Sequence, residues 1–346
     1  MSRQVRIAVA GAGMIGQAHV RRILDEPAAK LAAIVDPSPQ AQALAAELQV
    51  PHLADLDEAL RTIRPDGVVI ATPNRLHVPQ GLVAVAAGVP MLLEKPIADE
   101  LAAADELVAA AEARAVPILV GHHRRHSPLV QRARAVVEGG RLGRIVAVSG
   151  LCLFRKPQPY FEGAGAWRTQ PGGGVVLINL IHVIDDLRNI CGDIVAVQAV
   201  ASNATRGFAV EDTAAILLTF ASGALGTLIL SDAAAAPWSW ELTAGENKAY
   251  PQTDQACYLV AGTAGSLSVP RLDVWSHEGD DWWTPIRAER SFVPEADPLT
   301  LQMRHFCAVI RGETAPLLDG RGGARTLAAT LAVTRAAATG GTVRLD

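Results

Sequence analysis

The chain has 346 residues, half of them apolar, which is enough for about two domains with substantial cores. Its formal net charge is −4 and it carries no basic block, which argues against nucleic acid as a partner. The four cysteines are far apart and form no CxxC pair, so we expect reduced thiols and a cytoplasmic protein. The N-terminus carries no secretory signal and the longest apolar stretch is broken by glycine and proline, so no membrane partner is expected.

The first part of the chain alternates apolar runs with helical patterns. We expect strands at residues 5–10, 31–35, 67–71, 89–93 and 117–121, and helices at residues 14–24, 40–48, 55–64 and 99–115, with a further helix that ends at residue 87. Continuous apolar strands separated by helices are typical of a parallel sheet covered on both faces. The pattern therefore predicts an α/β fold, with a doubly wound Rossmann domain over residues 1–125.

The pattern changes after residue 126, where strands begin to follow one another directly. Strands are expected at residues 145–154, 195–202, 213–220, 224–232, 257–261 and 266–269, and helices at 128–138, 175–190, 300–311 and 323–338. Sequential strands with short turns indicate a mostly antiparallel sheet. Residues 233–255 are expected to form a long loop. We therefore predict a C-terminal α+β domain over residues 126–346, with the last helices able to pack back on the first domain.

A glycine turn directly follows the first strand and opens the first helix. Gly11, Gly13 and Gly16 fit the G-x-G-x-x-G pattern, in which the glycines permit a tight turn, pyrophosphate approach and close helix packing. The backbone N–H groups at the start of the helix, at Met14 and Ile15, face the diphosphate in such turns. The alternative is a plain glycine turn without a ligand.

Asp36 ends the second expected strand, twenty residues after Gly16. A carboxylate at this place can accept both ribose hydroxyls and repels a 2′-phosphate, which favours NAD over NADP. Alternatively, Asp36 caps the next helix.

Two later strands also end in polar residues. Thr72, Pro73, Asn74 and His77 follow the strand at 67–71, and we expect that edge to touch the nicotinamide ribose, or to be a turn capped by Asn74. Residues 94–96, Glu-Lys-Pro, follow the strand at 89–93. Parallel strands end at the same edge, so this lysine is expected beside the cofactor.

Together these stretches resemble the Gfo/Idh/MocA family of nicotinamide-dependent oxidoreductases. The resemblance covers nearly the whole chain and depends on the order and spacing of GAGMIG at 11–16, ATPNRLH at 71–77, EKP at 94–96, GHHRRHSP at 121–128, WR at 167–168 and GGGVVLINLIHVIDDLR at 172–188. It implies a Rossmann domain followed by an α/β domain on a large open sheet that makes homodimer or homotetramer contacts. It also implies hydride transfer between NAD and a sugar, cyclitol or related polyol.

The resemblance assigns roles position by position. Lys95 is similar to the active-site lysine and His182 to the histidine that acts as acid and base, with Glu94 beside the cofactor. Trp167 and Arg168 resemble a cofactor-edge pair. Arg124 and its neighbour His123 are expected to face the substrate, and Tyr160 to shape its pocket or simply to pack.

One position departs from the family pattern. The aspartate expected four residues before the histidine is replaced by Ile178, and Asn179 is the nearest polar group on that helix face. Asn179 can hydrogen-bond a substrate but cannot act as a base. Two alternatives therefore stay open: an NAD-dependent lyase or hydrolase that oxidises its substrate only transiently, and a non-catalytic NAD- and ligand-sensing protein.

The histidines at 122, 123 and 126 are potential metal ligands. Two arginines within the same run would repel a cation, and no carboxylate pair lies nearby in the sequence, so we expect no metal. His182 remains the best general base, because an imidazole titrates near neutrality.

Overall fold

The computed structural model describes residues 3–279 and 281–345 and divides into two compact units. The first unit comprises residues 1–126 and 298–327, and the second comprises residues 127–297 and 328–346. The segment 298–327 therefore joins the first unit although it follows the second in sequence. No helix within the described residues combines the length and the apolar character needed to cross a membrane.

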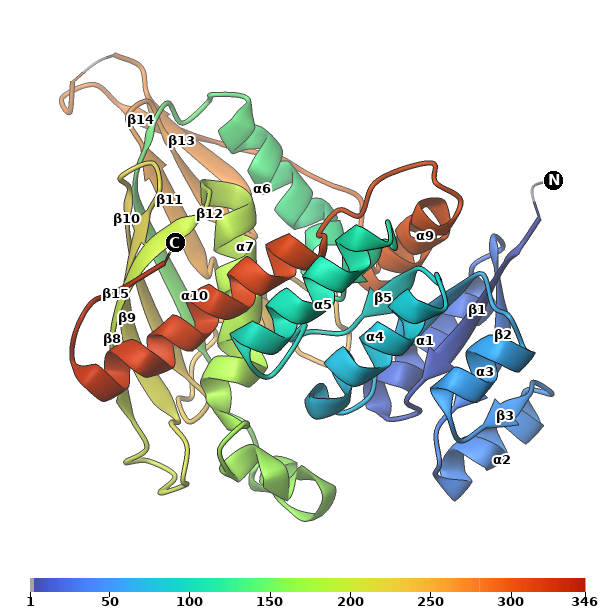
Figure 1. Cartoon of the computed structure of the whole chain (residues 1–346). Helices are drawn as coiled ribbons and strands as arrows, with labels where there is room; N and C mark the ends of the chain where they lie inside the picture. The colour runs from blue at the N-terminus through green and yellow to red at the C-terminus, as the bar shows by residue number, and fades with distance from the viewer. Residues whose placement is uncertain (1–2, 280, 346) are drawn as a thin grey trace. The chain divides into compact units, whose positions relative to one another are not determined.

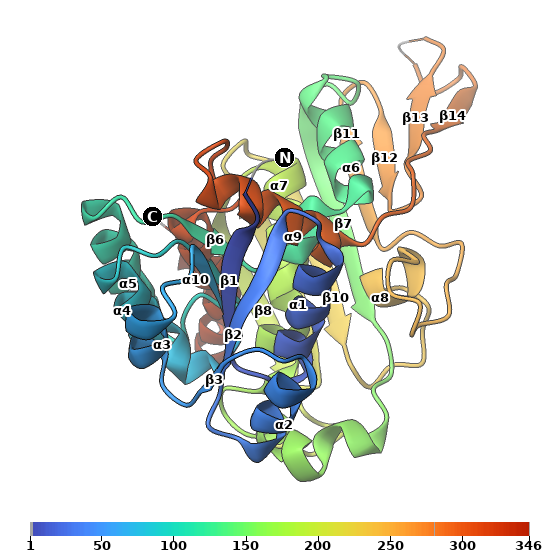
Figure 2. The same ribbon diagram turned by 90° about the vertical axis from the view of Figure 1, so that its right-hand side faces the viewer.

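The first unit is built on a six-stranded parallel sheet with strand order β3-β2-β1-β4-β5-β6. Figure 2 shows β1, β2 and β3 of this sheet with helices α1 and α2 alongside. The strands are β1 (Val5–Ala10), β2 (Ala29–Val35), β3 (His52–Leu53), β4 (Gly67–Ile70), β5 (Met91–Leu93) and β6 (Ile118–Val120). The helices are α1 (Met14–Asp25), α2 (Pro39–Glu47), α3 (Leu56–Thr62), α4 (His77–Ala86), α5 (Leu101–Ala113) and α9 (Pro298–Ile310). The predicted doubly wound sheet is confirmed, with the short β3 as an additional edge strand.

The strands of this sheet are apolar because helices cover them. All four residues of β4 are buried, as are all three of β5 and of β6. On one side the core includes Ile7, Val9 and Ile34 from the strands and Met303 and Phe306 from α9. Helix α9 thus completes the cover of the parallel sheet, which explains why a segment so late in the chain belongs to this unit.

The second unit contains a nine-stranded sheet of order β14-β13-β12-β11-β7-β10-β9-β8-β15. Only β7 and β10 pair in parallel; the other neighbours are antiparallel. The strands are β7 (Ile145–Leu153), β8 (Ile194–Ser202), β9 (Thr213–Phe220), β10 (Leu225–Ser231), β11 (Tyr258–Gly262), β12 (Ser266–Val269), β13 (Asp273–His277), β14 (Ile286–Arg290) and β15 (Val343–Arg344). The predicted open, mostly antiparallel sheet is confirmed, with β13, β14 and β15 beyond the expected strands.

Helices cover one face of the nine-stranded sheet. They are α6 (Pro128–Glu138), α7 (Ile181–Cys191) and the C-terminal part of α10 (Gly320–Thr339), and their apolar residues share a core with the strands. Figure 1 shows α6 and α7 beside the sheet. The segment expected as one helix over 175–190 begins as a π-helix, η5 (Val176–Leu180), before α7. The expected loop 233–255 contains the short helix α8 (Trp240–Thr243).

Candidate functional site

The glycine turn links β1 to α1 in the first unit, and its glycines have different surroundings. Gly11 has φ +91°, and a Cβ there would lie 2.5 Å from the Ala71 carbonyl oxygen. A Cβ on Gly16 would lie 1.9 Å from the Gly11 carbonyl oxygen, so close helix packing requires glycine. A Cβ on Gly13 would meet nothing within 4 Å. The backbone at Gly13 is therefore open, directly before the free N–H groups of α1 at Met14 and Ile15.

Asp36 lies against this turn. Its Oδ2 accepts a hydrogen bond of 2.8 Å from the Ala12 N–H, and its Oδ1 accepts one of 2.8 Å from the Ser38 N–H. Burial alone would raise the pKa of the Asp36 carboxyl, but the hydrogen bonds from Ser38 and Ala12 lower it below its usual value. An anionic carboxylate thus stands beside the glycine turn, where a dinucleotide ribose is held in Rossmann folds.

The loop after β4 is tied to the loop after β5 through one buried side chain. His77 is 1% exposed, and its ring nitrogens lie 2.7 Å from the Pro96 carbonyl oxygen and 2.9 Å from the Thr72 carbonyl oxygen. The Thr72 hydroxyl donates to Gln80 Oε1 at 2.8 Å. Burial lowers the pKa of His77, although the hydrogen bonds to the Pro96 and Thr72 carbonyls act to raise it. These contacts favour a role for His77 in holding both loops.

Pro73 and Asn74 lie at the start of the short helix η1 (Asn74–Leu76), where Pro73 is exposed and Asn74 is half-buried. Both residues are therefore accessible on the loop that His77 anchors.

Glu94 is buried at the end of β5 with a partner that sequence reasoning did not find. His19 on α1, itself fully buried, places Nε2 2.7 Å from Glu94 Oε1, and the Lys95 N–H donates to Glu94 Oε2 at 3.2 Å. Burial would raise the pKa of Glu94, but the hydrogen bond from His19 and the charge of Lys95 lower it. The carboxylate therefore anchors the backbone from which the half-buried Lys95 projects. No local pattern on α1 marks His19 as this partner.

The segment after β6 forms the short helix η2 (His123–His126). Burial and the neighbouring Arg124 lower the pKa of His123 to about 3, and Glu94 and Lys95 also act on it electrostatically. Arg124 is buried, at 5% exposure. The first unit therefore brings the glycine turn, Asp36, the 72–77 loop, Lys95 and His123 to the carboxyl edge of one parallel sheet. Within residues 3–279 and 281–345, no group of three or more His, Cys, Asp or Glu is arranged to hold a metal.

The remaining predicted residues lie in the second unit. His182 is in the first turn of α7 and is 9% exposed, and Asn179 is half-buried in the preceding π-helix. Further along α7, Asp186 accepts a hydrogen bond of 2.9 Å from the Tyr258 hydroxyl. Residues three apart on a helix are neighbours, so Asn179 and His182 share a side of this segment.

Tyr160, Trp167 and Arg168 form a cluster on the short helices η3 (Gln158–Phe161) and η4 (Gly163–Thr169). Arg168 Nη1 donates to the Tyr160 carbonyl oxygen at 2.8 Å, and its guanidinium carbon lies 4.1 Å from the Tyr160 ring centre and 5.2 Å from that of Trp167. Burial raises the pKa of Tyr160. Trp167 remains half exposed, so the cluster presents an aromatic and cationic surface.

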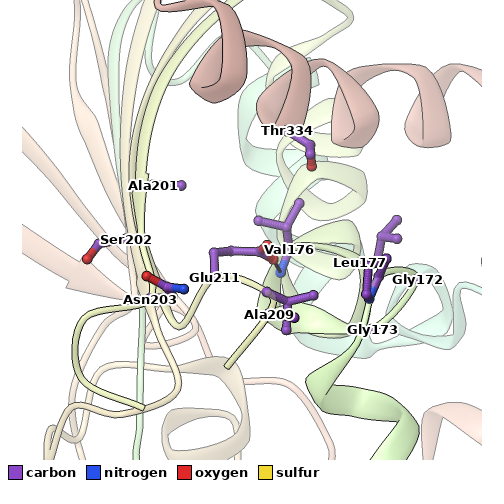
Figure 3. Close-up of a pocket in the computed structure, with 12 residues that line it drawn as sticks. Gly172, Gly173, Val176, Leu177, Ala201, Ser202, Asn203, Ala209, Glu211 and Thr334 are labelled. Carbon is purple, nitrogen blue, oxygen red and sulfur yellow. Dashed lines mark hydrogen bonds between the residues drawn. The ribbon is translucent and has the colours of Figure 1, made fainter. Parts of the chain in front are cut away.

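A cavity of about 400 Å³ lies elsewhere in the second unit, between the start of η5 and the end of β8 (Figure 3). None of the predicted site residues lines it. Glu211 projects into it, but its Oε1 accepts a hydrogen bond of 3.0 Å from the Val176 N–H and so caps the π-helix. The cavity is therefore separate from the residues to which chemistry is assigned.

Comparison with known proteins identifies two matching family models. One, described as "Oxidoreductase family, NAD-binding Rossmann fold", matches residues 5–122. The other, described as "GFO/IDH/MocA C-terminal domain", matches residues 130–268.

Several characterised proteins are similar along most of the chain. The 1,5-anhydro-D-fructose reductase of Ensifer adhaerens is 31% identical over 287 residues, covering 81% of this chain and 80% of the relative. The D-apiose dehydrogenase of Paraburkholderia graminis is 29% identical over 354 residues, covering 98% and 89%. The structure of the WlbA dehydrogenase from Bordetella pertussis with NADH and UDP-GlcNAcA superimposes with a TM-score of 0.81 at 26% identity, over 99% of both chains. The predicted resemblance, fold class and oxidoreductase class are confirmed.

Proposed function

Because the chain belongs to the Gfo/Idh/MocA family of oxidoreductases with an NAD-binding Rossmann fold, we propose that it transfers a hydride between NAD and a carbon bearing a hydroxyl or carbonyl in a sugar, cyclitol or related polyol. The observation that carries this proposal is the shared sheet edge in the first unit. There the open backbone at Gly13, the anionic Asp36 and the anchored Lys95 all follow strands of one parallel sheet.

Each part of the first unit has a defined task in binding the cofactor. The open turn and the N-terminus of α1 hold the diphosphate, because free N–H groups attract an anion. The Asp36 carboxylate accepts hydrogen bonds from the ribose hydroxyls. Its negative charge repels the extra phosphate of NADP, so NAD is preferred. Gly11 shapes the turn, while Thr72, Pro73, Asn74 and Glu94 shape the nicotinamide side, where His77 holds the loops. Trp167 and Arg168 are assigned to a cofactor edge by the resemblance to the family.

The proton chemistry is assigned to Lys95 and His182. NAD bound at the glycine turn would supply the acceptor for the hydride that leaves the alcohol carbon. Lys95 donates a hydrogen bond to the reacting oxygen and stabilises its negative charge as the proton leaves. His182 takes that proton as general base, and returns it when the reaction runs toward the alcohol. His123, Arg124, Tyr160 and Asn179 contact the rest of the substrate.

We further propose a cytoplasmic homodimer or homotetramer that forms through the nine-stranded sheet. Several large apolar side chains of β8, β9, β10 and β11 are exposed: Val200 73%, Leu217 52%, Leu225 63%, Ile229 41% and Leu259 55%. They alternate along the strands with buried residues, so they belong to the face opposite the helices. An apolar face of this extent is typical of a protein interface.

The test is a screen of sugars, inositols and polyols with NAD, in which both NADH absorbance and product are measured. Hydride transfer predicts NADH in an amount equal to the oxidised product. Product without NADH would instead identify a transient oxidation that ends in elimination or hydrolysis. Compounds that raise NAD affinity with neither NADH nor product would identify a sensor.

A further inference from the structure

A buried lysine of the second unit determines how Asn179 is oriented. Lys156 follows β7 and is 7% exposed, and its Nζ donates a hydrogen bond of 2.6 Å to Asn179 Oδ1. An ammonium group only donates, so the amide oxygen must face Lys156 and the Asn179 Nδ2 must point away from it. Among the residues that the structure describes, none accepts a hydrogen bond from this Nδ2.

Lys156 is itself held firmly. Its N–H donates to the Asp232 carbonyl oxygen at 2.9 Å, and its Nζ lies 3.3 Å from Asp232 Oδ2. Asp232 is also paired with Arg206 at 2.7 Å, and Arg206 donates to the Lys156 carbonyl oxygen at 3.0 Å. The ammonium lies 4.8 Å from the Tyr160 ring centre, over its face. Burial lowers the pKa of Lys156, while Asp232 stabilises the charged form.

The consequence is a pair of N–H donors one helical turn before His182. We propose that Lys156 is a positioning residue that turns the Asn179 Nδ2 donors into the substrate site, and that this part of the site takes a carboxylate, so that the substrate is a sugar acid. The inference rests on the proposed function, because it places the substrate beside His182.

The chemistry of the amide favours a carboxylate over a hydroxyl. The Asn179 Nδ2 group has two N–H donors and no acceptor. It therefore cannot accept the hydrogen bond that a substrate hydroxyl donates, whereas both oxygens of a carboxylate accept hydrogen bonds. Hydrogen bonds to an ionised acceptor are also about twice as strong as neutral ones. The ammonium 2.6 Å from the amide oxygen withdraws electron density and strengthens these donors. An aspartate at this place would instead repel an acid and favour a neutral sugar.

The test compares two matched pairs of compounds, glucuronate with glucose and galacturonate with galactose, which differ only in a carboxylate for a terminal CH2OH. We measure kcat and KM with NAD and the melting temperature with NAD bound. The wild type is expected to prefer the acids by at least about tenfold in kcat/KM, most of it in KM. The isosteric Asn179→Asp keeps its bond to Lys156, so it should fold, and it should reverse that preference.

Lys156→Met should lose the preference by about tenfold while NAD affinity stays unchanged, because the ammonium that donates to the Asn179 amide oxygen is gone and the amide is no longer held in one orientation. The control is Lys248→Met, which removes an exposed lysine paired with Glu295 at 3.0 Å and should change nothing. If Lys156→Met does not fold, the Asn179→Asp result decides alone.

A wild type that uses the neutral sugars as well as the acids, or an Asn179→Asp variant with an unchanged ratio, would overturn the inference and leave the proposed function standing. If none of the four compounds is turned over or raises the melting temperature, the inference is contradicted. The polyol screen described above then tests the proposed function separately.

Discussion

Replacing Gly13 with alanine separates cofactor binding from folding in the first unit. Gly13 has an extended backbone, φ −68° and ψ −170°, which alanine adopts without strain, and its Cβ would touch nothing within 4 Å. Removing a glycine from such a position stabilises a protein by about 0.4–1 kcal/mol through the unfolded chain. In the proposed complex, however, the new methyl group would stand where the diphosphate approaches the backbone.

The expected loss of affinity follows from the hydrogen bonds at that place. Each hydrogen bond from a backbone N–H to a charged phosphate oxygen contributes about 1.5–3 kcal/mol, and a displaced diphosphate forfeits at least one. Since about 1.4 kcal/mol corresponds to tenfold in Kd, Gly13→Ala should weaken NAD binding by about 10-fold to 100-fold. Calorimetric titration with NADH measures the Kd, and denaturant unfolding measures the stability.

Gly16→Ala is the matched control, because it is expected to lower the stability of the fold. Its Cβ would lie 1.9 Å from the Gly11 carbonyl oxygen, so α1 must shift away from β1, at a cost of about 1–3 kcal/mol. A folded Gly13→Ala variant with wild-type NAD affinity would refute the assignment of this turn to the diphosphate. A Gly16→Ala variant as stable as the wild type would refute the packing argument.

Three further predictions concern the cofactor, pH and assembly. Asp36→Ala should raise NADP affinity relative to NAD by about tenfold or more, as titrations with both cofactors can measure. His126 has its pKa lowered from 6.5 to about 3 by burial and by His305, so only the unfolded state binds its proton between those values, and stability falls as pH drops below 6.5. At about pH 5 His126 contributes about 2 kcal/mol to this loss, so the acid destabilisation measured by denaturant unfolding should be about 2 kcal/mol smaller in His126→Gln than in the wild type. Leu217→Glu, on the exposed sheet face, should yield monomers in light scattering.

Each of these predictions has a contrary outcome. An Asp36→Ala variant with an unchanged cofactor ratio would remove the carboxylate from NAD selection. Equal acid destabilisation in the wild type and in His126→Gln would show that other groups cause it. A Leu217→Glu variant that keeps the assembly state of the wild type would place the interface elsewhere.

Local patterns were sufficient to predict that Asp36 lies beside the glycine turn. The spacing of Gly11, Gly13 and Gly16 and the position of Asp36 are consequences of one strand, one turn and the next strand, so they can be read along the chain. The structure shows Asp36 bonded to the turn at Ala12, as this local geometry requires. The place of Lys95 was also predictable, because a buried strand ends two residues before it.

Features that depend on distant contacts were not predictable. The His19–Glu94 pair joins residues 75 positions apart, and the Lys156–Asn179 pair joins residues 23 positions apart, through tertiary packing alone. Strand β14 was missed because all five of its residues are exposed, so it lacks the alternation of a half-buried strand. The start of the helix before His182 carries no sequence signal that distinguishes a π-helix from an α-helix.

The central claim is that Lys95 stabilises the reacting oxygen while a hydride is transferred to NAD, and single-turnover kinetics of Lys95→Ala test it most directly. With the substrate found in the screen, the account predicts that NADH formation falls by about a hundredfold to a thousandfold, as for removal of a group that stabilises the charge of the reacting oxygen, while the Kd for NAD changes little. Rapid NADH formation by this variant would contradict the account.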